Sequence, residues 1–380
     1  MFAWILSLSA AFAVALNGTM VTPIIVLAIS RLPGWDEGSA TLVAACEIAG
    51  LALYGILFPH MAKRHGKIVA VVGFLAVILG EAATSLFIGA WSLAASRLTT
   101  GLGEGAIFGL VASHVASRSN AERLWGQINL IGGATMGLLM LSLSLLPSDL
   151  TGAPVFLYLA GFAALVAPLA LYAERRTSDS LTVIVPVTLS RGAMILTLSV
   201  VFLIYAVQAG QWAVAAFIGE IGNIDPARVV TYLAIASLLG FVGALVPTLS
   251  KGEKHRVVSI VAGFSTMAIS LWCFFNLVNE TSFVASQITL NTGFYMVTPY
   301  VTGLLTEGDP DGSLLSRVLI VALIGASVGT AVAGPILQTW GSVAFGWAYI
   351  TPLGLAMIAA VVVFGKSHLN CADARIEPAK

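Results

Sequence analysis

The chain is built from long apolar segments that are separated by short polar breaks. A helix needs about 20 apolar residues to cross a membrane, and breaks in hydropathy and clusters of charge delimit twelve segments of this length. They lie near residues 4–29, 39–60, 68–89, 92–114, 124–146, 154–173, 192–219, 229–249, 257–277, 282–305, 315–338 and 343–365. Because only 9% of the residues are charged, against about 25% in soluble domains, lipid must surround most of the chain. The sequence therefore predicts an all-α membrane protein with twelve transmembrane helices.

The basic residues lie almost entirely on one side of these predicted helices. Fifteen of the eighteen Lys and Arg residues fall in alternate loops or in the C-terminal tail, whereas Arg31 and Arg228 fall on the other side and Arg97 lies within a helix. Loops rich in Lys and Arg stay in the cytoplasm. We therefore expect a multi-pass protein of the cell membrane with both termini in the cytoplasm. Lys plus Arg and Asp plus Glu both number 18, so no excess of charge points to a nucleic-acid partner.

The second half of the chain repeats features of the first. Residues 95–99 (ASRLT) match residues 285–289 (ASQIT) at an offset of 190, and Gly103 falls on Gly293 at the same offset. Two further positions match in this way: Gly73 with Gly263 and Phe74 with Phe264. Such a repeat predicts two pseudo-symmetric six-helix bundles with a solute site near the middle of the membrane between them. The predicted units are a first bundle at 1–174, a cytoplasmic linker at 175–190, a second bundle at 191–366 and a cytoplasmic tail at 367–380.

Two local motifs resemble signatures of the major facilitator superfamily. Residues 61–67 (MAKRHGK) follow the second predicted helix, where that family carries L-A-D-R-x-G-R, and Lys63 replaces the acidic residue of that signature. Residues 97–105 (RLTTGLGEG) resemble the family's R-x-x-x-G-x-G pattern in the fourth helix. The resemblance covers essentially the whole chain, and it implies a secondary transporter in which Arg97 is tied to proton coupling. The fifth helix lacks the G-x-x-x-G-P signature of drug/proton antiporters.

Four ionisable residues fall inside predicted helices of the first half: Glu47, Glu81, Arg97 and Glu104. Such residues cost about 2.5–3.5 kcal/mol each on insertion scales, and they usually serve function. Counted from the turn near Gly89 at 1.5 Å per residue, Glu81 and Arg97 lie at similar depth, and Glu47 is level with them. We therefore expect Arg97 to pair with one or both glutamates, either as a structural ion pair or as part of a proton path. Glu104 lies two helical turns further along the same face, near the middle of the membrane, and we predict that it carries the coupling proton.

Two stripes of polar and aromatic residues follow helical spacing in the second half, one in the seventh predicted helix and one in the tenth. Such side chains can hydrogen-bond a solute and stack against it, whereas packing between helices is the alternative explanation for any one of them. Asn17, in the middle of the first predicted helix, is open to the same two interpretations. The predicted substrate-binding residues are Asn17, Arg97, Glu104, Tyr205, Gln208, Gln211, Trp212, Asn291 and Tyr295.

These features predict a secondary active transporter that moves a small organic solute by alternating access, coupled to protons and with symport favoured. Proton-antiport efflux of drugs or metabolites is the alternative. An integral-membrane enzyme is disfavoured because the sequence has no H-E-x-x-H motif and no metal-ligand spacing. We therefore predict no enzymatic activity, no cofactor and no metal. The expected partners are the solute, protons and membrane lipid, and the protein is expected to be a monomer.

Overall fold

The computed structural model describes residues 2–116, 121–145, 152–174, 191–249, 253–306 and 313–373, and all regular secondary structure within them is helical. The elements are α1 (Phe2–Ala15), α2 (Asn17–Met20), α3 (Thr22–Ser30), α4 (Glu37–Leu57), α5 (Met61–Leu86), α6 (Ala90–Ala116), α7 (Ala121–Ser144), α8 (Ala153–Glu174), α9 (Arg191–Ala213), α10 (Ala215–Ile221), α11 (Pro226–Gly240), the 3-10 helix η2 (Phe241–Ala244), α12 (Leu245–Leu249), α13 (Glu253–Asn276), α14 (Glu280–Thr306) and α15 (Ser313–Asp373).

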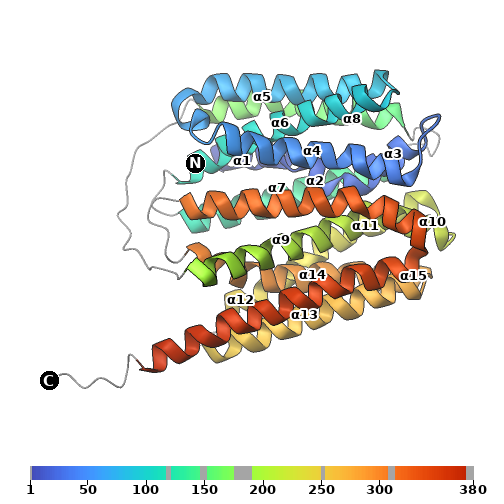
Figure 1. The fold of residues 1–380 in the computed structure, drawn as a ribbon. Helices are drawn as coiled ribbons and strands as arrows, with labels where there is room; N and C mark the ends of the chain where they lie inside the picture. Colours follow the sequence, from blue (N-terminus) through green and yellow to red (C-terminus); the bar gives the residue numbers. More distant parts are fainter. Residues whose placement is uncertain are drawn as a thin grey trace.

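The helices run side by side, with those of the first half of the chain above those of the second half in the view of Figure 1. Both termini lie at the same end of the molecule (Figure 1). The predicted linker, residues 175–190, lies outside the described residues, as do residues 374–380 of the predicted tail. Residues 367–373, predicted as tail, continue the last helix to Asp373.

Several of the predicted helices are not single rods. Residues 4–29 form α1, α2 and α3, with breaks at Leu16 and Val21, and Pro23 in the first turn of α3 has no N–H to continue the helical ladder. The segment predicted over 192–219 is broken at Val214, between α9 and α10. Conversely, α15 joins two predicted helices through Gly341, whose φ of 76° lies in the left-handed region that glycine adopts. The helical elements therefore do not correspond one to one with the twelve predicted helices.

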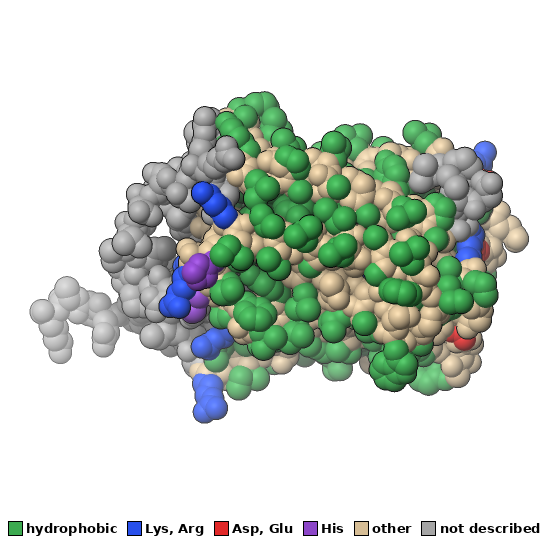
Figure 2. Space-filling view, turned by 90° about the horizontal axis from the view of Figure 1, so that it is seen from above, with side chains coloured by type: hydrophobic (Ala, Val, Ile, Leu, Met, Phe, Trp, Pro, Cys, Tyr) green, Lys and Arg blue, Asp and Glu red, His purple; other side chains and the backbone are tan. Residues whose placement is uncertain are grey.

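Eight helical stretches in the described residues are long and apolar enough to cross a membrane. They are Glu37–Leu57, Met61–Leu86, Leu124–Ser144, Ala153–Tyr172, Arg191–Ala213, Pro226–Pro247, Arg256–Asn276 and Arg317–Phe364. Figure 2 shows apolar side chains covering the middle of the molecule, with Lys, Arg and His side chains gathered at one end and further charged side chains at the other. Because a continuous apolar surface of this extent marks contact with lipid, the chain is an integral membrane protein.

The internal repeat of the sequence appears as a repeated contact between helices. In the first half, a Cβ atom on Gly103 of α6 would lie 2.6 Å from the carbonyl oxygen of Gly73 in α5. In the second half, a Cβ atom on Gly293 of α14 would lie 2.8 Å from the carbonyl oxygen of Gly263 in α13. Glycine lets two helix backbones approach this closely. The α5–α6 and α13–α14 pairs are therefore packed in the same way through matching positions.

The two halves are tied together at the end of the molecule opposite the termini. Asp36 caps α4 by accepting a hydrogen bond from the backbone N–H of Ser39 at 2.7 Å, and this bond lowers the pKa of Asp36. Its second oxygen accepts a hydrogen bond from the side-chain amide of Gln338 in α15 at 3.3 Å. Nearby, Arg31 forms an ion pair with Glu220 of α10 at 2.7 Å. Both contacts join residues of the first half to residues of the second.

Candidate functional site

A buried ion-pair cluster joins α4, α5 and α6. The guanidinium of Arg97 donates to Oε2 of Glu81 at 2.8 Å through Nη1, and to Oε2 of Glu47 at 3.1 Å through Nε. Its Nη2 atom also contacts both carboxylates. The ring of Phe156 in α8 lies 5.4 Å from the guanidinium carbon. All three charged side chains are 0% exposed, so the expected pairing of Arg97 occurs, and with both glutamates.

Small residues bring these three helices close enough for the ion pairs to form. A Cβ atom on Gly101 of α6 would lie 1.8 Å from the backbone oxygen of Glu47, and one on Gly80 of α5 would lie 2.3 Å from Oγ1 of Thr100. Real Cβ atoms essentially never approach other atoms within 3.0 Å. Larger residues would therefore separate the backbones that hold the charged side chains together.

Glu104 lies against the break in the first apolar segment. Its Oε1 atom accepts a hydrogen bond from the backbone N–H of Gly18 in α2 at 2.9 Å. The position that a Cβ atom of Gly18 would occupy is 2.7 Å from Oε2 of Glu104 and 2.6 Å from the carboxyl carbon of Glu47. Because the first turn of a helix leaves backbone N–H groups without helical partners, the break at Leu16 supplies the donor for this carboxylate.

Several polar atoms around this break have no hydrogen-bond partner among the described residues. They include both side-chain polar atoms of Asn17, Oε1 of Glu47 and Oε2 of Glu104, and all three residues are 0% exposed. Buried polar atoms without partners are uncommon in folded proteins, and each requires an explanation such as a bound molecule. The structure thus brings Asn17 and Glu104, both predicted from the sequence, to one region.

The second half contributes two amide pairs. Gln208 in α9 donates to Asn291 in α14 at 2.7 Å, and Gln287 in α14 donates to Gln211 in α9 at 3.0 Å. Gln208 Oε1, Gln211 Nε2 and Gln287 Oε1 have no hydrogen-bond partner in the part of the chain that the structure describes. Sequence reasoning did not select Gln287 as a site residue, although its position 190 residues after Arg97 was a usable signal.

Four rings pack next to these amides and form what we call the aromatic group: Tyr205, Phe241, Phe294 and Tyr295. The ring centroids of Tyr205 and Phe294 are 5.3 Å apart in an edge-on arrangement, and those of Phe294 and Tyr295 are also 5.3 Å apart. Tyr295 stacks on Phe241 with centroids 4.4 Å apart. Sequence reasoning found the two tyrosines by their helical spacing but not the two phenylalanines, because an isolated Phe in an apolar segment carries no signal.

Trp212 joins the two broken segments. Its indole N–H donates to the carbonyl oxygen of Met20 at 2.9 Å. Met20 precedes the break at Val21 and Trp212 lies just before the break at Val214. Trp212 was predicted to contact the solute, but its indole N–H already donates to the backbone of the other half.

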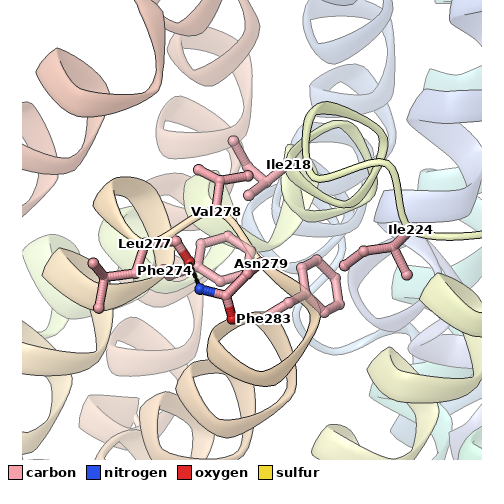
Figure 3. A pocket seen from close by; sticks show the side chains of 7 residues that line it. All are labelled: Ile218, Ile224, Phe274, Leu277, Val278, Asn279 and Phe283. Atoms are coloured by element: carbon pink, nitrogen blue, oxygen red, sulfur yellow. Dashed lines mark hydrogen bonds between the residues drawn. The ribbon is translucent and has the colours of Figure 1, made fainter.

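The pockets near the surface are separate from these polar residues. Figure 3 shows a small pocket at the ends of α10, α13 and α14, where Asn279 is the only polar side chain among the seven that line it. A second pocket, of about 300 Å³, lies between α4, α10 and α15 and is lined by Glu37, Glu220 and Gln338 together with apolar and small residues. Neither is lined by Glu104, Arg97 or the amide pairs, which are enclosed between the helices.

Solved transporter structures share this fold over nearly the whole chain. A variant of the nucleoside transporter NupG has a TM-score of 0.74 with 13% identity, covering 96% of this chain and 99% of its own. A D-xylose–proton symporter has a TM-score of 0.71 with 14% identity, over 95% of this chain and 97% of its own. The human organic anion transporter MFSD10 has a TM-score of 0.66 with 13% identity, over 94% and 98%. The sequence matches no protein-family model and no curated protein. The chain therefore has the fold of these solved transporters, as the resemblance of its motifs implied.

Proposed function

We propose that this chain is a secondary active transporter that moves a small organic solute across the cell membrane by alternating access, coupled to protons. The transporter fold supports this function and a non-enzymatic role. The observation that carries the coupling is Glu104, a fully buried carboxylate with one oxygen on the N–H of Gly18 and the other without a partner.

The proposed topology has twelve crossings in two six-helix bundles. α1–α3, α9–α10 and α11–α12 each count as one crossing that is bent or broken, and α15 counts as two that meet at Gly341. The bundles are residues 1–174 and 191–366, joined by a cytoplasmic linker at 175–190. The Lys, Arg and His side chains at the end that holds both termini (Figures 1 and 2) support a cytoplasmic position for that end. We propose that the protein works as a monomer.

Glu104 differs from the other two buried glutamates in its partners. Glu47 and Glu81 are held by Arg97, whereas Glu104 forms no ion pair within the described part of the chain. A proton can neutralise a buried carboxylate that has no cationic partner, and it can leave once the site opens to water. Arg97, Glu47 and Glu81 then position Glu104, the proposed proton carrier. The carboxyl groups of Glu47 and Glu104 both lie against Gly18, so the ion-pair cluster adjoins the residue that binds Glu104.

The solute is proposed to bind between the halves, in contact with Asn17 and Glu104 of the first half and with polar residues of α9 and α14. The contacts of the second half are Tyr205, Gln208, Gln211, Trp212, Asn291 and Tyr295. Rocking of the halves around this region would expose it to each side of the membrane in turn. Both symport and antiport are compatible with such a cycle.

Glu104→Gln tests the coupling. Proteoliposomes with a trapped pH-sensitive dye, exposed to a panel of sugars, nucleosides, amino acids, organic acids and amines, report which solutes move protons. The variant keeps the side-chain volume without the titrating group, so we expect it to abolish solute-linked proton movement. Glu280→Gln, which changes an exposed carboxylate, is the matched control and should behave as the unchanged protein. Normal proton movement by Glu104→Gln would remove this residue from the mechanism and make Glu81 or Glu47 the next candidate.

A further inference from the structure

The buried charges of the first half do not balance. Three carboxylates, those of Glu47, Glu81 and Glu104, accompany a single guanidinium, and all four side chains are 0% exposed. The Arg97 donors are directed at two of the carboxylates, and a ring covers the guanidinium. Oε1 of Glu47 and Oε2 of Glu104 accept no hydrogen bond from any described residue. A bound group that brings positive charge would compensate this excess.

The equivalent region of the second half supplies no charge. Glu81, Arg97 and Glu104 have neutral counterparts 190 residues later, namely Leu271, Gln287 and Phe294. Glu104 in particular is matched by a phenylalanine, Phe294, which packs between Tyr205 and Tyr295 in the aromatic group. Across the proposed solute site, a carboxylate in one half is therefore related by the repeat to an aromatic ring in the other.

The aromatic group reaches the boundary between the halves. A Cβ atom on Gly133 of α7 would lie 3.0 Å from the ring of Phe241, so this ring abuts a helix of the first half. Faces of Tyr and Phe rings attract organic cations through their quadrupoles, most strongly where water is excluded. Tyr205, Phe241 and Tyr295 are the partly exposed members of the group, whereas Phe294 is 8% exposed.

An anionic solute fits this arrangement poorly. Its charge would approach the unpartnered oxygens of Glu47 and Glu104, and the Arg97 guanidinium that could bind it is already held by Glu47 and Glu81. The second half offers amide groups, which bind neutral and charged solutes alike. The carboxylates of the first half thus select the sign of the solute charge, and the rings of the second half bind the organic part of the solute.

We infer that the solute is a small organic cation, whose positively charged nitrogen binds the carboxylate of Glu104 beside Gly18 and whose organic part packs against the aromatic group. This inference rests on the proposed function, because it takes the region between the halves as the solute path. The same carboxylate then holds either a proton or the cation. Binding of the cation releases the proton from Glu104 to water on the side that is open, and one positive charge replaces another. Among the coupling modes left open above, this competition selects exchange of solute for protons.

Binding of shape-matched probes to the purified full-length protein tests the inference. Choline and its uncharged carbon analogue 3,3-dimethyl-1-butanol form one pair, and tetraphenylphosphonium and tetraphenylborate form a second pair that differs in the sign of the charge. Calorimetry gives the affinity, and a pH indicator in weak buffer gives the protons released. We expect at least one cation to bind with proton release, and neither the uncharged nor the anionic partner to do so.

Two variants assign the contacts. Glu104→Gln should weaken binding of the cation on the order of 30-fold or more, the loss typical of removing one member of a buried charge pair, and should end proton release. Phe294→Leu should weaken it roughly threefold or more by removing one ring face. Phe274→Leu, which changes a buried ring in the pocket of Figure 3, is the matched control and should leave the affinity unchanged.

Failure of both cations to bind would overturn the inference, as would equal binding of a cation and its uncharged or anionic partner. In that case the proposed function still stands if another solute of the panel moves protons in a way that depends on Glu104. Conversely, cation binding that is weakened by Glu104→Gln but releases no proton would support the cationic solute, and it would overturn both the exchange of solute for protons and the proposed proton coupling. The two proposals therefore fail separately.

Discussion

Replacement of Arg97 by Ala is the most direct perturbation of the buried cluster. The guanidinium contacts the carboxylates of Glu47 and Glu81, and all three side chains are fully buried. Removing one partner of a buried ion pair costs about 3–5 kcal/mol, because the remaining charge loses its compensation. Since one substitution here leaves two carboxylates uncompensated, we expect Arg97→Ala to lower the free energy of unfolding by about 5 kcal/mol.

The measurement is unfolding of the purified protein in mixed micelles, by titration with denaturing detergent. Arg228→Ala is the control, because the ion pair between Arg228 and Glu280 has side chains that are 65% and 45% exposed, and exposed pairs contribute little. A double-mutant cycle of Arg97→Ala with Glu81→Gln isolates the pair. The double variant should lose less than the sum of the single losses, by about 1–3 kcal/mol.

Two results would refute this reasoning. One is strict additivity in the cycles with both Glu81→Gln and Glu47→Gln, which would mean that neither carboxylate interacts with Arg97. The other is an Arg97→Ala variant that is as stable as Arg228→Ala, because a buried carboxylate that has lost its cation must lower the free energy of unfolding.

Three further predictions follow from the fold. Cysteine at Ser178 should react with a membrane-impermeant thiol reagent only from the cytoplasm and cysteine at Asn223 only from outside, and labelling of both from one side would contradict the proposed topology. Gly101→Ala should lower the free energy of unfolding by about 1–3 kcal/mol through overpacking. Gly126→Ala should not, because no atom lies within 4 Å of the new Cβ. Equal stability of the two variants would show that the helices adjust freely. The capping hydrogen bond from the Ser39 backbone lowers the pKa of Asp36. The stability that Asp36 contributes is therefore present above its unfolded-state pKa, about 4, and is lost as the pH falls through its folded-state pKa. In detergent unfolding between pH 6 and pH 3, Asp36→Asn should lose less stability than the unchanged protein, and parallel curves for the two proteins would exclude this role.

The partners of Arg97 could be predicted because they depend on depth alone. Two helices joined by a short turn place residues at equal distances from that turn side by side, so Glu81 and Arg97 meet across α5 and α6. The contact of Glu104 with the Gly18 backbone could not be predicted in this way. It requires a helix break inside an apolar segment, and the hydropathy of residues 4–29 is the same whether the helix is continuous or broken.

The contacts between helices that are distant in the sequence were also beyond sequence reasoning. The pairing of Gln211 with Gln287 and the hydrogen bond from Trp212 to Met20 join residues far apart in the chain. Local spacing says which face of a helix is polar, but the partner of that face is chosen by how whole helices pack. The repeat offered one usable signal, because it relates Gln287 to Arg97.

The sequence by itself determined the solvent, the secondary structure and the repeat. A chain with so few charges can be solvated only by lipid, and spacing at a fixed offset reproduces the α5–α6 contact in α13–α14 because the same glycines allow the same close approach. The tertiary structure alone decided where helices break, which buried oxygens remain without donors and which rings lie near them. These features depend on the free energy of packing many distant segments at once, and no single segment contains that information.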